Sequence, residues 1–183
     1  MHNTKAITMT AVMASIALLL SIARIEIPFY PLIYLKFDFA EMPSVLTFLL
    51  VGAKWGYLCA LVHYAGLLAR SGDPLGPTMK FLAVSSMLLG MQLSGSHSKL
   101  SLALGALARI AAMSLANMLV IGFLFPSWIP AIQGLLKTAG LEVEGWNEVM
   151  CATLTLTGVF NALHTLLSVI PAMLVEREVR RRV

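Results

Sequence analysis

The sequence has few charged residues: only 12% of its 183 residues are Asp, Glu, Lys or Arg. In an ordinary soluble domain about a quarter of the residues are charged. Hydrophobic residues make up 58% of the chain, and the mean hydropathy is +0.84. This balance excludes an ordinary soluble domain and predicts an all-α integral membrane protein. The length leaves no room for a second, soluble ATPase domain, so we expect one membrane domain over residues 1–183.

Catalytic motifs are also lacking. The chain has no glycine-rich phosphate loop ending in Lys-Ser/Thr, no His-Glu-x-x-His and no Gly-x-Ser-x-Gly. Its four histidines are scattered, and Cys-x-x-Cys is absent. We therefore expect a protein that is not an enzyme, with no catalytic residue, no metal and no cofactor. ATP-driven transport would need another protein to supply the ATPase.

Cysteine is scarce. The excess positive charge is concentrated at the C-terminus rather than in a broad basic surface patch. Cys59 and Cys151 both lie in apolar stretches, which favours free buried thiols over a disulfide. The net charge of +4 includes four arginines at the extreme C-terminus, directly after an apolar run. Such a cluster is typical of a cytoplasmic membrane anchor, so no nucleic-acid partner is expected.

Six apolar segments are candidates to span the bilayer, which takes about 20 mostly apolar residues. The second is short and must tilt, kink or extend into the residues before it. Turn signals separate the segments at 52–54, 71–77 and 94–99. The six predicted segments are 5–25, 42–51, 54–69, 77–93, 100–125 and 149–175.

The stretch between the last two segments, about 126–148, is mixed in character. Apolar residues at helical spacing predict a short helix lying in the membrane interface, followed by an acidic turn. The helix residues are Trp128, Ile129, Ile132, Leu135 and Leu136, and the turn residues are Glu142, Glu144 and Glu148.

An even number of spans places both termini on one side. That side carries seven Lys and Arg residues and the opposite side five, with Arg109 inside a predicted span. The positive-inside rule then predicts cytoplasmic termini in a multi-pass plasma-membrane protein. The loop before the second segment would face outward.

That loop, about 26–42, places charges between two strongly apolar runs. Charges there need partners, water or a ligand, because bare burial is too costly. The loop is either an ordinary solvated loop or one wall of a polar binding site. The aromatic residues among its charges favour the binding site. The candidate residues are Tyr34, Lys36, Asp38, Phe39 and Glu41.

Polar residues inside the apolar segments are further candidates. Asn161 and His164 are three residues apart, so they share a helix face and need a common partner, which is either a neighbouring helix or a ligand. Asn117 offers a donor and an acceptor for a flat heterocycle, or an interhelical bond. Arg109 is expected to snorkel to the interface rather than bind a ligand. We expect His63 to be a packing residue that is hydrogen-bonded within the bundle rather than a ligand-binding residue.

Small residues recur four apart near the N-terminus, at Ala6, Thr10 and Ala14. Such spacing lets another helix approach closely. The alternatives are packing within the chain and a docking face for a partner membrane protein.

The segment Pro31–Pro43, PLIYLKFDFAEMP, resembles the first-loop signature of the riboflavin-binding S component of energy-coupling factor (ECF) transporters. That family shows Leu-Lys-x-Asp-Phe-Ser-Asp-x-Pro, and this chain has Ala40 and Glu41 in place of the serine and aspartate. Residues 160–164, FNALH, resemble the family's Phe-Asn-x-x-Lys, with His164 in place of the lysine. Asn117 matches an asparagine of the fifth helix.

Two further sites depart from the family pattern. His63-Tyr64 stands where a Lys-Asn pair is typical, and Met79-Lys80 where an asparagine begins the fourth helix. The resemblance covers essentially the whole chain and implies an S-component-like bundle of six transmembrane helices.

In function, the resemblance implies a subunit that captures riboflavin or a related flavin from outside. Its partners would be a transmembrane coupling protein, docked on Ala6, Thr10 and Ala14, and two cytoplasmic ATPases. The flavin would be the transported ligand and not a cofactor. The alternatives are an S component for another heterocyclic vitamin or precursor, and a small membrane enzyme. The expected binding residues are Tyr34, Lys36, Asp38, Phe39, Glu41, His63, Lys80, Asn117, Asn161 and His164.

Overall fold

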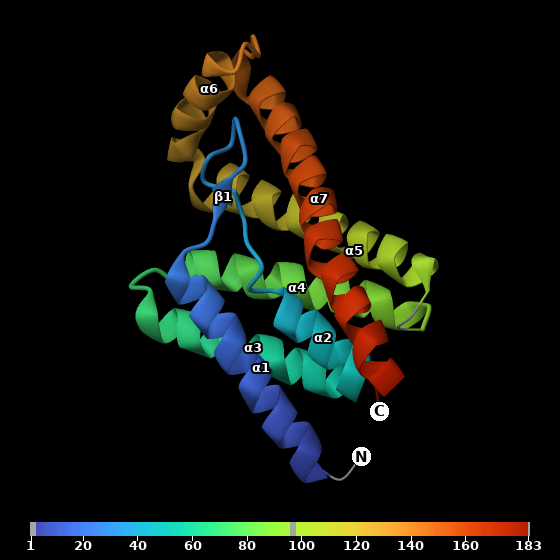
Figure 1. Cartoon of the computed structure of the whole chain (residues 1–183). Helices are drawn as coiled ribbons and strands as arrows, with labels where there is room; N and C mark the ends of the chain where they lie inside the picture. Colours follow the sequence, from blue (N-terminus) through green and yellow to red (C-terminus); the bar gives the residue numbers. More distant parts are fainter. Residues whose placement is uncertain (1–2, 96–97, 183) are drawn as a thin grey trace.

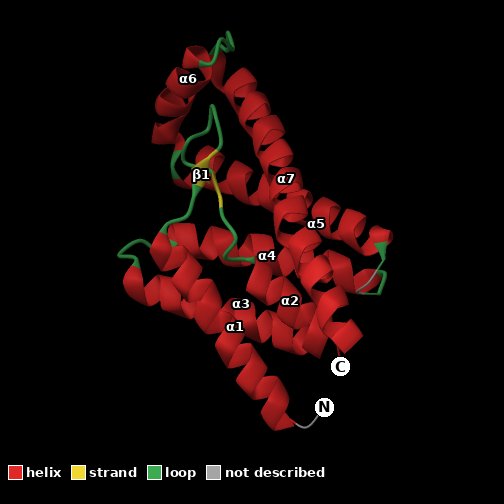
Figure 2. Cartoon of the chain, in the orientation of Figure 1, coloured by secondary structure: helices red, strands yellow, loops and turns green. Residues whose placement is uncertain are grey.

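The computed structural model describes residues 3–95 and 98–182 as a helical bundle with one short β-hairpin (Figures 1 and 2). Two strands, β1 (Ile27–Pro28) and β2 (Lys36–Phe37), pair antiparallel, with Ile27 opposite Phe37. The helices are α1 (Asn3–Ala23), α2 (Met42–Val51), α3 (Ala53–Arg70), α4 (Leu75–Leu93), α5 (Lys99–Leu119), α6 (Ile129–Thr138) and α7 (Gly145–Arg182). A π-helical turn (Val120–Leu124) extends α5, and a 3₁₀ turn (Pro126–Trp128) precedes α6.

Each of the six predicted apolar segments coincides with a helix, and α2 has the predicted bounds. The additional helix, α6, is the predicted short helix of the 126–148 loop. The acidic turn is partly wrong, because α7 begins at Gly145 and includes Glu148 in its first turn. The Glu148 carboxylate accepts a hydrogen bond from the backbone N–H of Glu144 at 2.7 Å, and a negative charge suits a helix N-terminus.

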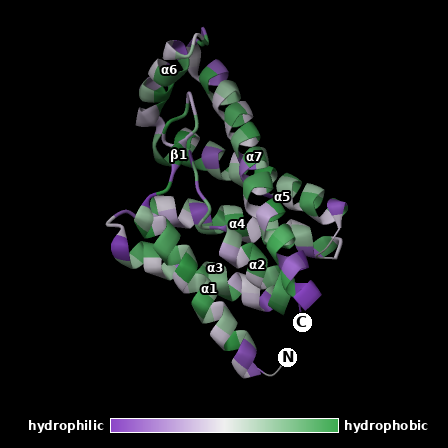
Figure 3. Cartoon of the chain, viewed as in Figure 1, coloured by the Kyte–Doolittle hydropathy of each residue, from purple (hydrophilic) through white to green (hydrophobic). Residues whose placement is uncertain are grey.

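Among the described residues, three helices are long and apolar enough to cross a membrane: α1, the stretch Lys99–Leu124, and α7. Six spans therefore stay a prediction. The ten residues of α2 cover about 15 Å at 1.5 Å per residue, about half of the hydrocarbon core. Gly52, with φ of +120°, turns the chain directly into α3, as the turn signal at 52–54 predicted. The apolar colouring of the helices is visible in Figure 3.

The other two predicted turns are shorter than their sequence signals suggested. The α4 helix begins at Leu75, so Pro77 lies within its first turn, where its missing N–H removes no helical bond. The side chain of Ser98 caps α5 by accepting from the backbone N–H of Ser101 at 3.0 Å. Positions 96 and 97 of the predicted 94–99 turn lie outside the described residues.

Two apolar clusters form the core of the described chain. One joins α2, α3, α4 and α7, and includes Phe48, Met87 and Val169. The other joins the hairpin loop, the π turn, α6 and α7, and includes Leu32, Ile121 and Leu136. The N-terminal end of α1 and the C-terminal end of α7 lie at one end of the molecule, with the hairpin and α6 at the other (Figure 1).

The small residues of α1 are packed inside the chain. Ala6, Thr10 and Ala14 are 3%, 3% and 1% exposed, and α1 packs on α2 and α3. The prediction that these residues form a partner-docking face is therefore wrong, because their small side chains let α1 approach its own neighbours closely. Both cysteines are free, as predicted, but only Cys59 is buried and Cys151 is exposed.

Candidate functional site

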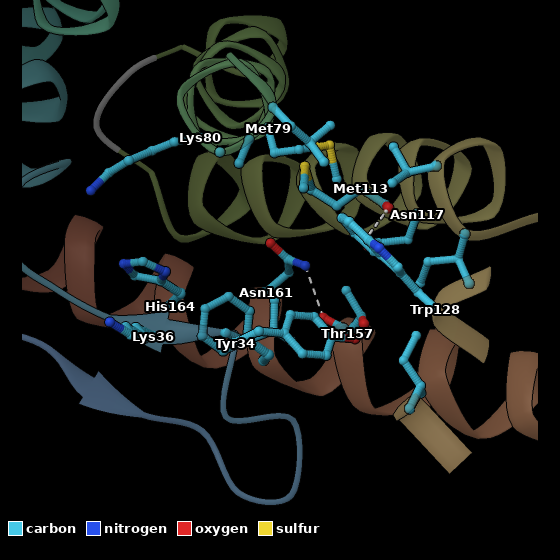
Figure 4. Close-up of a pocket in the computed structure, with 18 of the residues that line it drawn as sticks. Tyr34, Lys36, Met79, Lys80, Met113, Asn117, Trp128, Thr157, Asn161 and His164 are labelled. Atoms are coloured by element: carbon cyan, nitrogen blue, oxygen red, sulfur yellow. Dashed lines mark hydrogen bonds between the residues drawn. The ribbon is translucent and has the colours of Figure 1, made fainter. Parts of the chain in front are cut away.

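A cavity of about 540 Å³ lies between the hairpin loop, α4, α5 and α7, with α6 and the turn before it contributing to its wall. Ligand pockets commonly have volumes of about 300–1,000 Å³. Figure 4 shows Met79 and Lys80 reaching it from α4, Met113 and Asn117 from α5, and Thr157, Asn161 and His164 from α7. Most of the predicted site residues line it: Tyr34, Lys36, Asp38, Glu41, Lys80, Asn117, Asn161 and His164.

Much of the cavity lining is apolar and aromatic. Tyr34, Trp128 and Phe160 supply rings, and Met79 and Met113 supply flexible thioethers. Aromatic faces and thioethers pack well against a flat ring system. Burial raises the pKa of the Tyr34 phenol to about 12, so the hydroxyl is uncharged at neutral pH.

Asp38 fastens the end of the hairpin loop to α4. Its Oδ2 accepts a hydrogen bond from Lys80 Nζ at 2.5 Å, and its Oδ1 accepts from the backbone N–H of Ala40 at 2.9 Å. The two charged side chains of the pair are only 10% and 19% exposed. The loop on this side of the cavity is thus held to α4 by a largely buried ion pair.

Arg109 lines the cavity and is paired there with a buried carboxylate, so the prediction that it snorkels to the interface is wrong. It is 2% exposed, and its Nη1 and Nη2 donate to the two carboxylate oxygens of Glu41, which is 1% exposed. Glu41 Oε2 also accepts from Ser168 Oγ at 3.3 Å. A buried charge is tolerated when it is paired and hydrogen-bonded, which explains why Arg109 stays inside the bundle.

Asn161 and His164 share Arg109 as their common partner, as their three-residue spacing required. Arg109 Nε donates to Asn161 Oδ1 at 2.9 Å, and Arg109 Nη2 donates to His164 Nδ1 at 3.2 Å. A guanidinium can only donate, so His164 Nδ1 accepts and Nε2 carries the proton. Nε2 then donates to the carbonyl oxygen of Asp38 at 3.1 Å, which ties α7 to the loop.

Asn117 and Thr157 also line the cavity. Asn117 Nδ2 donates to the carbonyl of Met113 at 2.8 Å, one turn earlier in α5. Thr157 is 1% exposed, and its hydroxyl is one of four buried side-chain groups among the described residues that have no hydrogen-bond partner. Of these four groups, only that of Thr157 belongs to a residue that lines the large cavity.

Two of the predicted site residues do not line this cavity. Phe39 is 39% exposed and outside the lining. His63 is 3% exposed, bonds Ser21 Oγ at 2.9 Å, and borders a separate small void. His63 matches the alternative interpretation of a satisfied packing residue, because α3 carries it toward α1 rather than toward the cavity.

Sequence reasoning missed Arg109 and Thr157 as residues of the site. A signal for Arg109 was present, since a lone cation in an apolar segment must pair with a carboxylate and Glu41 is equally isolated. No comparable signal marks Thr157. Three other threonines of α7, Thr153, Thr155 and Thr165, donate to backbone carbonyls four residues earlier. Thr157 lacks such a bond, and this difference is visible only in the folded chain.

Among the described residues, no group of three or more His, Cys, Asp or Glu could hold a metal ion. No family model matches the sequence. Over 90 residues the chain is 37% identical to a protein named riboflavin transporter RibU from Staphylococcus aureus (strain TCH60). That match covers 49% of this chain and 47% of the relative, so the chain aligns with about half of the relative's length.

Among solved structures, the chain resembles one described as the S component of a bacterial ECF transporter, with a TM-score of 0.74 and 23% identity. The match covers 98% of both chains. The first-loop resemblance is thereby confirmed at the level of fold, and the chain has the S-component fold.

Proposed function

We propose that this chain is the substrate-binding subunit of an ECF-type vitamin uptake transporter, and that it captures riboflavin or a closely related flavin. The observation that carries the proposal is the convergence of the hairpin loop, α5 and α7 on one cavity of about 540 Å³. The partial match to a protein named riboflavin transporter points to the same ligand.

The chemistry of the cavity suits a flavin. Its ring system is flat and apolar on both faces, with a polar edge and a polyhydroxylated side chain. Tyr34, Trp128 and Phe160 would cover the ring faces, while Asn117 and Asn161 would meet polar groups of the ligand.

The charges of the cavity favour an uncharged ligand. Each cation of its lining already bonds a carboxylate of the chain: Lys36 bonds Glu26, Lys80 bonds Asp38, and Arg109 bonds Glu41. The Lys80 and Arg109 pairs are largely buried, so these two cations are not free to neutralise an anionic ligand, and a ligand charge without a partner would be costly to bury. Riboflavin is neutral and meets this condition.

The transport step would depend on partners. A transmembrane coupling protein and two cytoplasmic ATPases would supply the energy, because the sequence has no nucleotide-binding motif. With both termini in the cytoplasm of a plasma-membrane protein, the hairpin and α6 would lie toward the exterior, since they occupy the opposite end of the molecule (Figure 1). The ligand would leave chemically unchanged, so the proposed role is not enzymatic.

One observation favours a second candidate, a different heterocyclic vitamin or precursor. His164 stands where the resembling family has a lysine, and both of its ring nitrogens bond groups of the chain. A ligand whose side chain needs a lysine contact would lose it here.

Native mass spectrometry of the purified, detergent-solubilised chain tests the proposal. We expect a bound mass equal to riboflavin, and visible absorbance typical of a flavin. Fluorescence quenching on titration of riboflavin into ligand-free protein should saturate at one equivalent. A different heterocycle in the spectrum, together with no quenching by riboflavin, would support the second candidate.

A further inference from the structure

A second cavity, of about 320 Å³, lies where the end of α1, the end of α3 and the start of α4 come together (Figure 1). It adjoins the large cavity, because Gly76 and Lys80 line both. Three cations line it, Arg24, Arg70 and Lys80, and Glu26 is the one carboxylate of its lining among the described residues. We call it the arginine groove, after Arg24 and Arg70.

The two arginines have no carboxylate partner within the described ranges. Arg24 makes no hydrogen bond or ion pair there, and Arg70 donates one long bond, from Nη1 to the carbonyl of Ser21 at 3.5 Å. Glu26 bonds Lys36 instead, at 2.7 Å from Nζ. Both arginines are exposed, so most of their N–H donors are open to a ligand that enters the groove.

A phosphate group matches these donors. A guanidinium presents a planar fork of N–H groups that can bond two phosphate oxygens at once. Gly76 lies in the first turn of α4, where backbone N–H groups have no helical acceptor and the helix dipole favours an anion. Asp73 lies outside the groove lining, and its carboxylate accepts from the backbone N–H of Leu75 at 3.0 Å.

The groove lies at a membrane surface. The α1 helix is long and apolar enough to cross a bilayer, and Arg24 directly follows it. Exposed apolar side chains stand beside both arginines in the sequence: Ile22 and Ile25 are close to Arg24, and Leu68 precedes Arg70. Cations that follow an apolar helix surface are placed to reach phospholipid headgroups while the apolar side chains face the acyl chains.

We propose that the arginine groove binds a phosphate group, at a site distinct from that of the transported ligand. Arg24 and Arg70 bond the phosphate oxygens, and the start of α4 contributes the N–H of Gly76. The phosphate belongs to the headgroup of an anionic phospholipid or to free phosphate, which share this chemistry. A bound phosphate joins the end of α1 to the end of α3 and the start of α4. The proposal does not depend on which vitamin occupies the large cavity.

Lipid titration of the purified, delipidated chain in a neutral detergent, followed by native mass spectrometry, tests the lipid source. Phosphatidylglycerol should bind at least about tenfold more tightly than phosphatidylcholine, whose choline cation offsets the phosphate charge. In Arg24→Gln/Arg70→Gln this preference should fall below about threefold, because both forks are lost. The control, Lys99→Gln/Lys137→Gln, makes the same change in net charge at exposed lysines outside the groove, and its preference should equal that of the wild type.

Inorganic phosphate, titrated at constant ionic strength, tests the free source, with the melting temperature as the readout. A saturable rise with phosphate alone that is absent from Arg24→Gln/Arg70→Gln would identify free phosphate as the ligand. A response to phosphatidylglycerol and not to inorganic phosphate would identify the lipid. Arg24→Lys/Arg70→Lys keeps the charges and removes the forks, so it should retain only part of the wild-type response.

Three results would overturn the proposal. The wild type could respond to neither probe, or the Arg24→Gln/Arg70→Gln variant could keep the wild-type response. An equal loss in the lysine control would show that the response follows net charge and not the groove. Arg24→Gln alone guards against misfolding, because Arg24 has no bond within the described chain to lose. This single variant should melt, without lipid, at the wild-type temperature and still show a weaker preference for phosphatidylglycerol.

Discussion

Arg109 and Glu41 form a two-point ion pair in which neither side chain is more than 2% exposed. The pair connects the middle of α5 to the residue that precedes α2, and Asn161, His164 and Ser168 of α7 join it through hydrogen bonds. Three parts of the bundle that are far apart in sequence therefore meet at one guanidinium. Four residues of this network, Glu41, Arg109, Asn161 and His164, line the cavity and are held in place by one another.

Glu41→Gln should destabilise the chain by about 3–5 kcal/mol, because it leaves the Arg109 charge buried without a carboxylate. The measurement is unfolding of the detergent-solubilised protein by heat or denaturant. The double variant Glu41→Leu/Arg109→Met removes both charges and should recover a large part of the loss. A single variant as stable as the wild type would show that the pair contributes little.

Lys80→Met should speed ligand release about tenfold, because it breaks the ion pair that holds the loop residue Asp38 to α4. Stopped-flow fluorescence of flavin dissociation gives the rate. Lys36→Met is the matched control: its ion pair with Glu26 involves a lysine side chain that is 50% exposed, and such surface pairs contribute little. Equal dissociation rates in the two variants would contradict a fastening role for Lys80.

Riboflavin 5′-phosphate should bind at least about tenfold more weakly than riboflavin. Lys80 and Arg109 are held in largely buried ion pairs with Asp38 and Glu41, so a phosphate beside them would find no free cation in a largely apolar cavity. Competition titrations of both ligands provide the comparison, and lumiflavin, which has no ribityl chain, is the uncharged control. Equal affinities for the phosphorylated and unphosphorylated ligands would show that a cation is available after all.

The helices could be predicted from sequence because apolar runs and glycine or proline turns are local signals. Met42–Val51 was correct at both ends for that reason. Pairings between segments are not local. The sequence showed that Arg109 and Glu41 were isolated charges in apolar surroundings, but the fold was needed to place one beside the other.

The small-residue pattern of α1 likewise does not identify its packing partner. Spacing of four residues predicts that a helix approaches closely, and it does not say which helix. The buried positions Ala6, Thr10 and Ala14 face α2 and α3 of the same chain. Likewise, Phe39 and His63 are residue types common in binding sites, but they do not line the cavity. The direction of their side chains depends on how the loop and α3 pack in the folded chain.

Gly90→Ala should destabilise the bundle by about 1–3 kcal/mol, because a side chain at this position has no space. A Cβ atom on Gly90 would overlap the backbone carbonyl of Leu104, and a backbone group of α5 cannot move aside as a flexible side chain can. The change should widen the α4–α5 contact, and flavin affinity should fall with it, since Lys80 and Asn117 reach the cavity from these two helices.

Gly134→Ala in α6 is the control, because a Cβ atom there meets nothing within 4 Å. Alanine is favoured over glycine inside a helix by up to about 1 kcal/mol, so this variant should melt at the same temperature as the wild type or slightly above it. The measurement compares the melting temperatures of the Gly90→Ala and Gly134→Ala variants in the same detergent. If Gly90→Ala melted no lower than Gly134→Ala, the close approach of α4 and α5 at Gly90 would not be a determinant of stability.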